Sequence, residues 1–293
     1  MRLWLLILLA SGAVLGTSLA FVALLPSGLL AAPREVAVIP IEGLISATPS
    51  ASALGLASSG GITRALRDAD RDPSVAAVVL RINSPGGTPA AVQEVVTELR
   101  RVQKPVVASL GDIAASGAYY IASQARRIYA DNDTLTGSIG ALWVFQNASG
   151  KHAEEGVNFT VIKSGAFKDL GADYRGLTEA EEAYIQQLVN EVTDRFVDAV
   201  ASGRRLNRSE VLPLADGRVY SGVAARGFKL VDEIGNFYDA LEGAARLAGV
   251  APPAEAKEVV RRDSPLAPFL TQVRALTESQ GSQVLLIPAL GLR

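Results

Sequence analysis

The residue of this chain with the clearest chemical potential is Ser116, in the segment G-D-I-A-A-S-G-A-Y-Y-I-A that spans residues 111–122. The apolar run before it, residues 106–110, is typical of a buried parallel strand, and the small residues after it recur at helical spacing. We therefore expect Ser116 at a strand-to-helix turn, beside the N–H groups of a helix N-terminus. Such a serine suits acyl transfer as a nucleophile, although an ordinary N-cap serine shows the same pattern.

A serine nucleophile needs a general base, and the composition narrows the choice. The 293 residues include no cysteine and one histidine, His152. His152 lies in the polar segment 147–156, which we interpret as an exposed helix. The base is therefore expected to be a lysine or a carboxylate, and serine–lysine pairs are an established arrangement. A lysine with its ordinary pKa of about 10.4 would have to be made less basic, which burial among apolar groups can do.

An acyl-transfer site also needs N–H donors for the oxyanion. Gly86 and Gly87 follow a buried strand predicted over residues 75–82, and Ser116 follows the next strand along the chain. The carboxyl ends of parallel strands meet at one edge of the sheet, where open α/β sheets bind their ligands. We expect an oxyanion hole made by this glycine loop and the Gly117 N–H, while a glycine turn without a catalytic role is the alternative.

The elements that must position these residues alternate between strand and helix, which predicts an α/β fold with right-handed parallel crossovers. The expected strands are residues 36–43, 75–82, 106–110, 159–162 and 230–234, with a turn and strand at residues 216–220. The expected helices are residues 62–70, 89–102, 179–202, 221–226 and 236–247. Residues 46–61, rich in Ser, Ala and Gly, predict a loop, and residues 135–140 predict a glycine-flanked turn.

The first part of the chain predicts a membrane anchor, because residues 3–32 carry no charged side chain. About 20 apolar residues span a bilayer, whereas the apolar region of a cleaved signal peptide runs about 7–15 residues. Arg2 favours a cytoplasmic N-terminus, with the rest of the chain outside the cytoplasm. The formal net charge of −2 provides no basic field, so we expect no nucleic-acid partner.

Five motifs together resemble the signal peptide peptidase A family, which comprises membrane-anchored serine–lysine peptidases on the fold shared by the Clp protease and the crotonases. The motifs are N-S-P-G-G (83–87), A-A-S-G-A-Y-Y-I-A (114–122), L-T-G-S-I-G (135–140), I-K-S-G-A-F-K-D (162–169) and D-G-R-V-Y-S-G (216–222). The resemblance covers residues 35–248 and points to the short, single-copy form of the family. It implies stacked parallel sheets with flanking helices, preceded by one transmembrane helix.

The resemblance also implies roles for individual residues. Ser116 would be the nucleophile, Lys168 the general base, and Ser138 a hydroxyl that orients the lysine amine. Lys163 is the alternative base, since it directly follows a predicted strand. The family pattern K-S-G-x-x-K-D favours the second lysine. Asp169 would hold a proton on a neighbouring amine, so its carboxylate is expected to point away from Lys168.

We thus expect an anchor at residues 1–33, a peptidase domain at residues 34–249 and a C-terminal tail at residues 250–293. The expected enzyme is a single-pass, homo-oligomeric endopeptidase of the cell membrane, held in the bilayer by residues 3–25. Its extracytoplasmic domain would cleave apolar peptides such as released signal peptides, with no metal or cofactor.

Three other interpretations stay open. A related membrane serine–lysine peptidase cleaves stomatin-like proteins, but the A-A-S-G-A-Y-Y and D-G-R-V-Y motifs favour the first family. A crotonase-type acyl-CoA hydratase or isomerase would share the fold, but that chemistry gives no reason for an anchor. A catalytically inactive scaffold is disfavoured by the complete set of serine, lysine and paired glycines.

Overall fold

The computed structural model describes residues 35–48, 57–251, 255–258 and 284–285. The chain divides into two units, Met1–Arg34 and Glu35–Arg293, and everything described below belongs to the second. The predicted anchor at residues 1–33, with its bilayer segment 3–25, lies outside the described residues. Among the helices that are described, none is both long and apolar enough to cross a bilayer.

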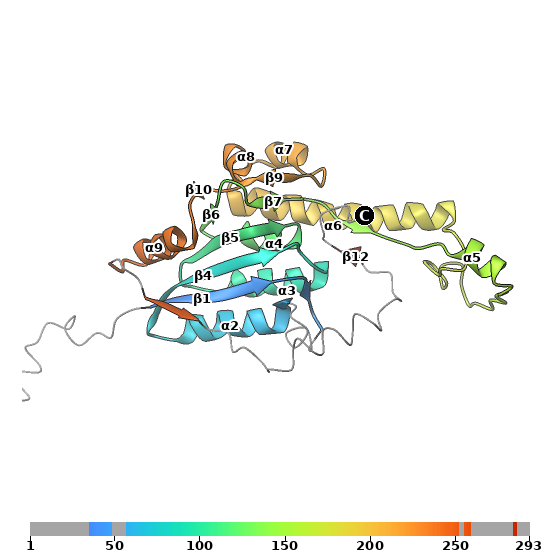
Figure 1. The fold of residues 1–293 in the computed structure, drawn as a ribbon, viewed down its shortest axis with the longest axis horizontal. Helices are drawn as coiled ribbons and strands as arrows, with labels where there is room; N and C mark the ends of the chain where they lie inside the picture. Colours follow the sequence, from blue (N-terminus) through green and yellow to red (C-terminus); the bar gives the residue numbers. More distant parts are fainter. Residues whose placement is uncertain (1–34, 49–56, 252–254, 259–283, 286–293) are drawn as a thin grey trace, which may run out of the picture. The chain divides into compact units, whose positions relative to one another are not determined.

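A mostly parallel sheet lies at the centre of the second unit (Figure 1). Its strands follow the order β10 (Glu233–Ile234), β6 (Arg127–Ala130), β5 (Val106–Ala115), β4 (Val75–Ser84), β1 (Glu35–Glu42) and β11 (Ala256–Glu258). Each of these neighbours pairs in parallel. The prediction of an α/β fold with a parallel-dominated sheet is therefore confirmed.

Helices cover both faces of the sheet, because its central strands are apolar on both sides. Ile39 of β1 and Leu80 of β4 belong to one buried cluster, whereas Val38 and Val79, one residue away, belong to another. The first cluster includes residues of α2 (Ser59–Arg71), α3 (Pro89–Leu99), α4 (Gly117–Ala122) and α6 (Glu179–Arg204). The second is closed by α9 (Phe237–Leu247).

Strand β5 changes its partner halfway along its length. Residues 107–109 pair with β6, while residues 113–115 pair with β7 (Leu135–Gly137). Strand β7 in turn pairs antiparallel with β9 (Val219–Ser221). The sequence predicted that the strand ended at residue 110 and that residues 135–140 formed a turn. The second pairing carries β5 on to Ala115, so Ser116 directly follows a paired strand.

Residues 144–191, here called the arm, extend past the end of the sheet (Figure 1). The arm contains α5 (Ser149–Glu154), an irregular segment and the first half of α6. The second half of α6 enters the core, where Phe196 stacks on Tyr120 of α4 with ring centroids 4.6 Å apart. The strand predicted over residues 159–162 does not form, because no described strand pairs with it and Ile162 is 96% exposed.

Other differences from the expected elements lie near the ends of segments. Helix α2 begins at Ser59, inside the predicted loop 46–61. The last predicted strand, residues 230–234, shortens to β10. The predicted tail supplies β11 and also β12 (Val284–Leu285), which pairs antiparallel with β8 (Leu142–Trp143). Short elements complete the described chain, namely β2 (Ile45–Ser46), β3 (Ala57–Ser58), α7 (Arg208–Val211), η2 (Leu212–Leu214) and α8 (Gly222–Gly227).

Candidate active site

Ser116 stands between β5 and α4 with a backbone φ of 55°, a value that residues with a side chain rarely adopt. Such a conformation costs about 1–3 kcal/mol and persists only where the surroundings enforce it. Its N–H donates to the Gly137 carbonyl at 2.8 Å, and its carbonyl accepts the Tyr120 N–H at 2.9 Å. The strained turn is therefore held by a neighbouring strand on one side and by its own helix on the other.

The Ser116 hydroxyl is buried but has no hydrogen-bond partner among the described residues. The whole residue is 1% exposed. A buried hydroxyl normally finds a partner, because leaving one unpaired costs about 1–3 kcal/mol. An unpaired Oγ on a strained turn is the arrangement expected of a nucleophile whose partners arrive with the substrate or with another group.

Ser138 occupies a matching turn on the neighbouring strand. It follows β7 as Ser116 follows β5, and the residues before them, Gly137 and Ala115, are register partners. Ser138 also has a positive φ, 51°, and is 3% exposed. Its N–H donates to the Arg218 carbonyl at 2.9 Å. The structure thus brings the two predicted serines to adjacent positions at one edge of the sheet.

The loop containing Gly86 and Gly87 lies at the same edge, because Ser84 of β4 pairs with Ala114 of β5. Gly86 has a φ of 113°, and its N–H donates to the Ser84 Oγ at 3.1 Å. A Cβ on Gly87 would lie 2.0 Å from the Ile45 carbonyl oxygen, so only glycine fits there. This close approach fixes the loop against β2.

The backbone donors near Ser116 differ in availability. The Gly86 N–H is already paired with Ser84. Gly117 is the first residue of α4, so its N–H has no acceptor within that helix. For the N–H of Gly87, no acceptor is present among the residues described. Of the three predicted oxyanion donors, the N–H groups of Gly87 and Gly117 thus have no acceptor in the part of the chain that the structure describes.

The two candidate lysines both lie in the arm and not beside Ser116. Lys168 is exposed, in a turn closed by its N–H and the Gly165 carbonyl at 3.1 Å. Burial of this lysine among apolar groups was expected, and the described residues of this chain do not provide it. Lys163 donates from Nζ to Asp169 Oδ1 at 2.7 Å and to the Ala166 carbonyl at 3.1 Å.

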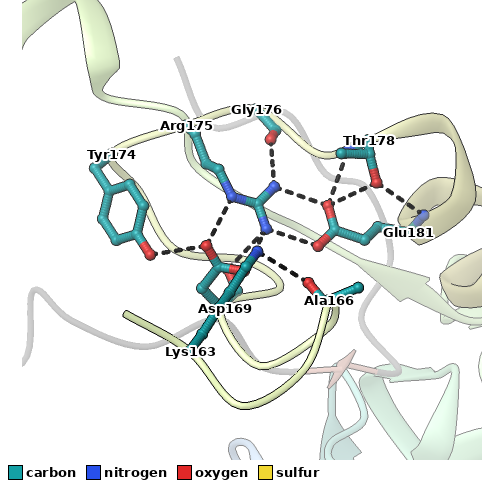
Figure 2. A network of polar contacts seen from close by, with 8 residues as sticks. All are labelled: Lys163, Ala166, Asp169, Tyr174, Arg175, Gly176, Thr178 and Glu181. Carbon is teal, nitrogen blue, oxygen red and sulfur yellow. Dashed lines mark hydrogen bonds and ion pairs between the residues drawn. The ribbon is translucent and has the colours of Figure 1, made fainter. Parts of the chain in front are cut away.

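The carboxylate of Asp169, the residue after Lys168, is held by other side chains of the arm (Figure 2). Its carboxylate accepts hydrogen bonds from Arg175, Lys163 and the Tyr174 hydroxyl. Arg175 foremost, and then Lys163, hold the pKa of Asp169 well below its usual range. The negative charge beside Lys168 is therefore neutralised by partners of its own.

Arg175 is the residue that the sequence analysis missed. Its guanidinium lies between Asp169 and Glu181, and Glu181 also accepts the Thr178 N–H at 2.8 Å (Figure 2). Glu181 forms a capping box with Thr178 at the start of α6. The T-x-x-E spacing is readable in the sequence and marks this helix start. The position of Arg175 between the two carboxylates had no comparable signal.

The single histidine of the chain lies away from the two serines. His152 of α5 approaches Asp173 at 3.4 Å and packs edge-on against Phe159, so it belongs to the arm. Within the described ranges, no group of three His, Asp or Glu side chains is arranged to hold a metal ion.

Comparison with known proteins identifies relatives of the same kind. The model of "Peptidase family S49" matches residues 98–251, more than half of the chain. A candidate protease of Methanocaldococcus jannaschii is 38% identical over 190 residues, 64% of this chain. Protease 4 of Haemophilus influenzae is 38% identical over 229 residues, 73% of this chain. A candidate signal peptide peptidase of Enterococcus faecium is 39% identical over 180 residues, 60% of this chain.

The matched regions cover only part of these relatives: 61% of the archaeal protein, 35% of Protease 4 and 52% of the enterococcal protein. The family match begins within α3 and includes both serines and both candidate lysines. The Gly86–Gly87 loop precedes it. The predicted resemblance to signal peptide peptidases is confirmed at the level of the family.

Proposed function

Since the chain belongs to peptidase family S49, we propose that it is a serine endopeptidase in which Ser116 is the nucleophile and Lys168 the general base. One observation carries the proposal: the buried, unpaired Ser116 hydroxyl on a strained strand-to-helix turn. A serine with only a structural role gains nothing from this backbone strain, whereas a nucleophile needs its Oγ held rigidly toward the substrate.

The proposed reaction proceeds in two steps. The lysine amine takes the proton from Ser116 Oγ as that oxygen bonds to the scissile carbonyl carbon, and the N–H groups of Gly87 and Gly117 bind the oxyanion. Collapse of this tetrahedral intermediate breaks the scissile C–N bond. The leaving amine receives the proton from the lysine, and an acyl-enzyme remains. Water then adds to the ester carbonyl carbon with the lysine amine as base. The ester bond breaks, which releases the carboxylic acid product and restores Ser116.

The base is proposed to come from a second copy of the chain. Lys168 is exposed in the arm, and Ser116 Oγ has no partner among the described residues of its own chain. The arm also exposes apolar side chains, including Phe159 at 48% and Val161 at 44%, which suits contact with another subunit. Ser138 lies adjacent to Ser116. Its hydroxyl is proposed to accept a hydrogen bond from the incoming Lys168 amine or to donate one to it.

The proposed substrates are apolar peptides such as released signal peptides, cleaved at the cell membrane. The name of the enterococcal relative and the uncharged run of residues 3–32 support this proposal. The same run supports an anchor at residues 3–25 with the catalytic domain outside the cytoplasm. The matched family is one of peptidases, which disfavours the acyl-CoA alternative.

The test is peptide hydrolysis by the full-length chain, purified in a mild detergent, compared with its Ser116→Ala variant. We expect the variant to lose about a thousandfold or more of kcat/KM, with unchanged circular dichroism. A variant that hydrolyses the peptide at the wild-type rate would exclude Ser116 as the nucleophile. Light scattering of the same samples checks assembly, and a fully active monomer would exclude a base donated by a second copy.

A further inference from the structure

The segment that carries Lys168 buries little apolar surface, although Phe167 packs edge-on against Tyr184 of α6 and Phe159 stacks on Tyr174. Residues 157–168 are exposed throughout, and two of its aromatic side chains, Phe159 and Phe167, are about half exposed. A catalytic group must be held to within about 0.5 Å to be effective. Polar contacts must therefore supply most of the rigidity of this loop.

Asp169, the residue directly after Lys168, is the point at which the loop is tied. Its side chain is only 11% exposed. Arg175 approaches it with two donors, Nε to Oδ2 at 3.0 Å and Nη2 to Oδ1 at 2.7 Å (Figure 2). This two-point contact fixes the direction of the carboxylate as well as its distance.

The opposite edge of the same guanidinium is tied to α6. Nη1 donates to Glu181 Oε2 at 2.8 Å, and Nη2 donates to Glu181 Oε1 at 2.7 Å. Nη1 also donates to the Gly176 carbonyl at 2.9 Å. All side-chain N–H groups of Arg175 thus have acceptors. One cation joins the carboxylates of Asp169 and Glu181, which lie on opposite sides of it.

Glu181 is a fixed support because the helix start holds it. The residue is 2% exposed and accepts both the N–H and the hydroxyl of Thr178. Arg175 and the Thr178 N–H lower the pKa of Glu181 to about 2. Its carboxylate is therefore charged at neutral pH and depends on Arg175 for its counter-charge.

Helix α6 connects this support to the nucleophile. Farther along the same helix, Phe196 stacks on Tyr120, and the Tyr120 hydroxyl donates to the Arg195 carbonyl at 3.2 Å. Tyr120 lies in α4, the helix that begins directly after Ser116. One continuous helix of 26 residues therefore connects Glu181, which supports the Lys168 loop, to α4, the helix that follows Ser116.

We propose that Arg175 is a positioning residue for the reaction: it clamps the loop that carries Lys168 to the first turn of α6 through Asp169 and Glu181. The inference rests on the proposed function, in which Lys168 is the base. It applies whether Lys168 serves its own subunit or a neighbouring one, since in both cases the loop must have one orientation. Arg175 touches no reacting atom.

Arginine is suited to this clamp and lysine is not. The planar guanidinium offers two donors to each carboxylate, whereas an ammonium is a point charge that cannot form both two-point contacts. Without the cation, Asp169 and the buried Glu181 would repel each other and the loop would separate from α6. We therefore expect a loss in the chemical step, with little change in substrate binding.

The experiment uses the full-length chain in detergent and compares Arg175→Met and Arg175→Lys with the wild type. We expect Arg175→Met to lower kcat roughly 10- to 100-fold while KM changes less than about threefold. Arg175→Lys should restore part of this loss. Titration with a fluorophosphonate counts the reactive serines, so that kcat refers to folded sites only. Full kcat per site in Arg175→Met would overturn the proposal.

Arg208 provides a matched control, because it also bridges two carboxylates, Asp194 and Asp198, on an exposed part of α6. Arg208→Met should leave kcat unchanged, and an equal loss in this variant would show a general effect on the helix and overturn the clamp. The Ser116→Ala variant is assayed beside it. Activity that survives in Ser116→Ala rejects the proposed function, whereas its loss together with full activity of Arg175→Met rejects only the clamp.

A double-mutant cycle tests the route through Asp169. If Arg175 acts by holding Asp169, the combination of Arg175→Met and Asp169→Asn should be at most about threefold worse than the poorer single variant. Independent roles would instead multiply the two losses. Multiplied losses in kcat would overturn the clamp as the means by which Arg175 acts.

Discussion

The two halves of the proposed dyad lie in regions that are built in opposite ways. Ser116 is buried, and its backbone is held by hydrogen bonds to Gly137 and Tyr120. Lys168 is exposed, and its loop is held by the side chains of Asp169 and Arg175. The proposed nucleophile is thus placed by the sheet and the proposed base by ion pairs.

This difference separates what each region can tolerate. Backbone pairing does not depend on the identity of most side chains, so the turn at Ser116 is sensitive mainly to substitutions that alter the backbone. An ion-pair network depends on individual charges and on pH. A base on an ion-paired loop is easier to adjust and easier to lose than a nucleophile at the end of a strand.

The largest effect in the arm is expected from Lys168→Ala. Its kcat/KM should fall about a thousandfold or more at every pH, because the proposed general base is removed. Lys163→Ala removes a lysine from the same loop and serves as the comparison. It should keep the rising limb of the pH profile and at least about a tenth of kcat/KM.

Measurement of kcat/KM across pH in both variants decides between the lysines. Loss of the rising limb only in Lys163→Ala would transfer the role of base to Lys163. Survival of activity in both variants to the same extent would reject a lysine base and, with it, the contrast between the two regions.

In the sheet region, the next largest effect is expected from Gly137→Ala. Gly137 has a φ of 81°, and a Cβ there would lie 2.6 Å from the Tyr220 ring. We expect the free energy of unfolding to fall by about 2–4 kcal/mol, and kcat to fall roughly tenfold, since the Gly137 carbonyl holds the Ser116 N–H.

Gly217→Ala is the matched control for this prediction. Gly217 has a φ of 86°, but nothing lies within 4 Å of its Cβ position. The Gly217→Ala substitution should lower the free energy of unfolding by about 1 kcal/mol, through backbone strain alone, and leave kcat unchanged. Denaturant titration gives the unfolding free energies. Equal losses in the two variants would show that contact with Tyr220 plays no part.

Acid should loosen the arm before it loosens the sheet. The folded-state pKa of Glu181 is lowered to about 2, and that of Asp169 is also lowered. Carboxylates of this kind add stability above their unfolded pKa of about 4, and that stability is lost as the pH falls toward the folded value. Between about pH 4.5 and pH 2, we expect the amide hydrogen exchange rates of residues 163–176 to rise relative to those of β5.

Exchange rates corrected for the intrinsic effect of pH provide this measurement. In Arg175→Met the same segment should already exchange fast at neutral pH. A simultaneous gain in β5 and in the arm would show that acid unfolds the second unit as a whole.

The smallest effect is expected from Tyr174→Phe. The Tyr174 hydroxyl donates one of the hydrogen bonds to Asp169, at 3.0 Å, while its ring stacks on Phe159. Removing the hydroxyl leaves Arg175 and Lys163 in place, so kcat should fall less than about threefold. A larger loss would move the main support of the loop from Arg175 to Tyr174.

The sequence predicted the sheet region well because its signals are local and strong. Strands β1, β4 and β5 carry apolar runs rich in Val, Ile, Leu and Ala, and the glycine loop and Ser116 lie beyond the ends of two of them. The extension of β5 to Ala115 was missed, since it depends on pairing with β7, more than 20 residues away. The left-handed turn at Ser138 was missed for the same reason.

The arm was predicted less well because its structure is decided by specific side chains. The apolar run at residues 159–162 has strand-like composition, yet no described strand lies beside it. The contacts of Arg175 with Asp169 and Glu181 join residues six positions apart in both directions, a spacing that follows neither strand nor helix periodicity. Only the capping box at Thr178 was readable.

The pairing of β7 with β9 has a consequence for biosynthesis. Ser138 donates its N–H to Arg218, 80 positions later in the chain. At about 5–20 residues per second, a ribosome needs roughly 4–16 s to make the intervening segment. A nascent chain therefore carries Ser116, the proposed nucleophile, for several seconds before the strand that fixes the neighbouring turn exists. The order of synthesis delays completion of the site until most of the domain has been made.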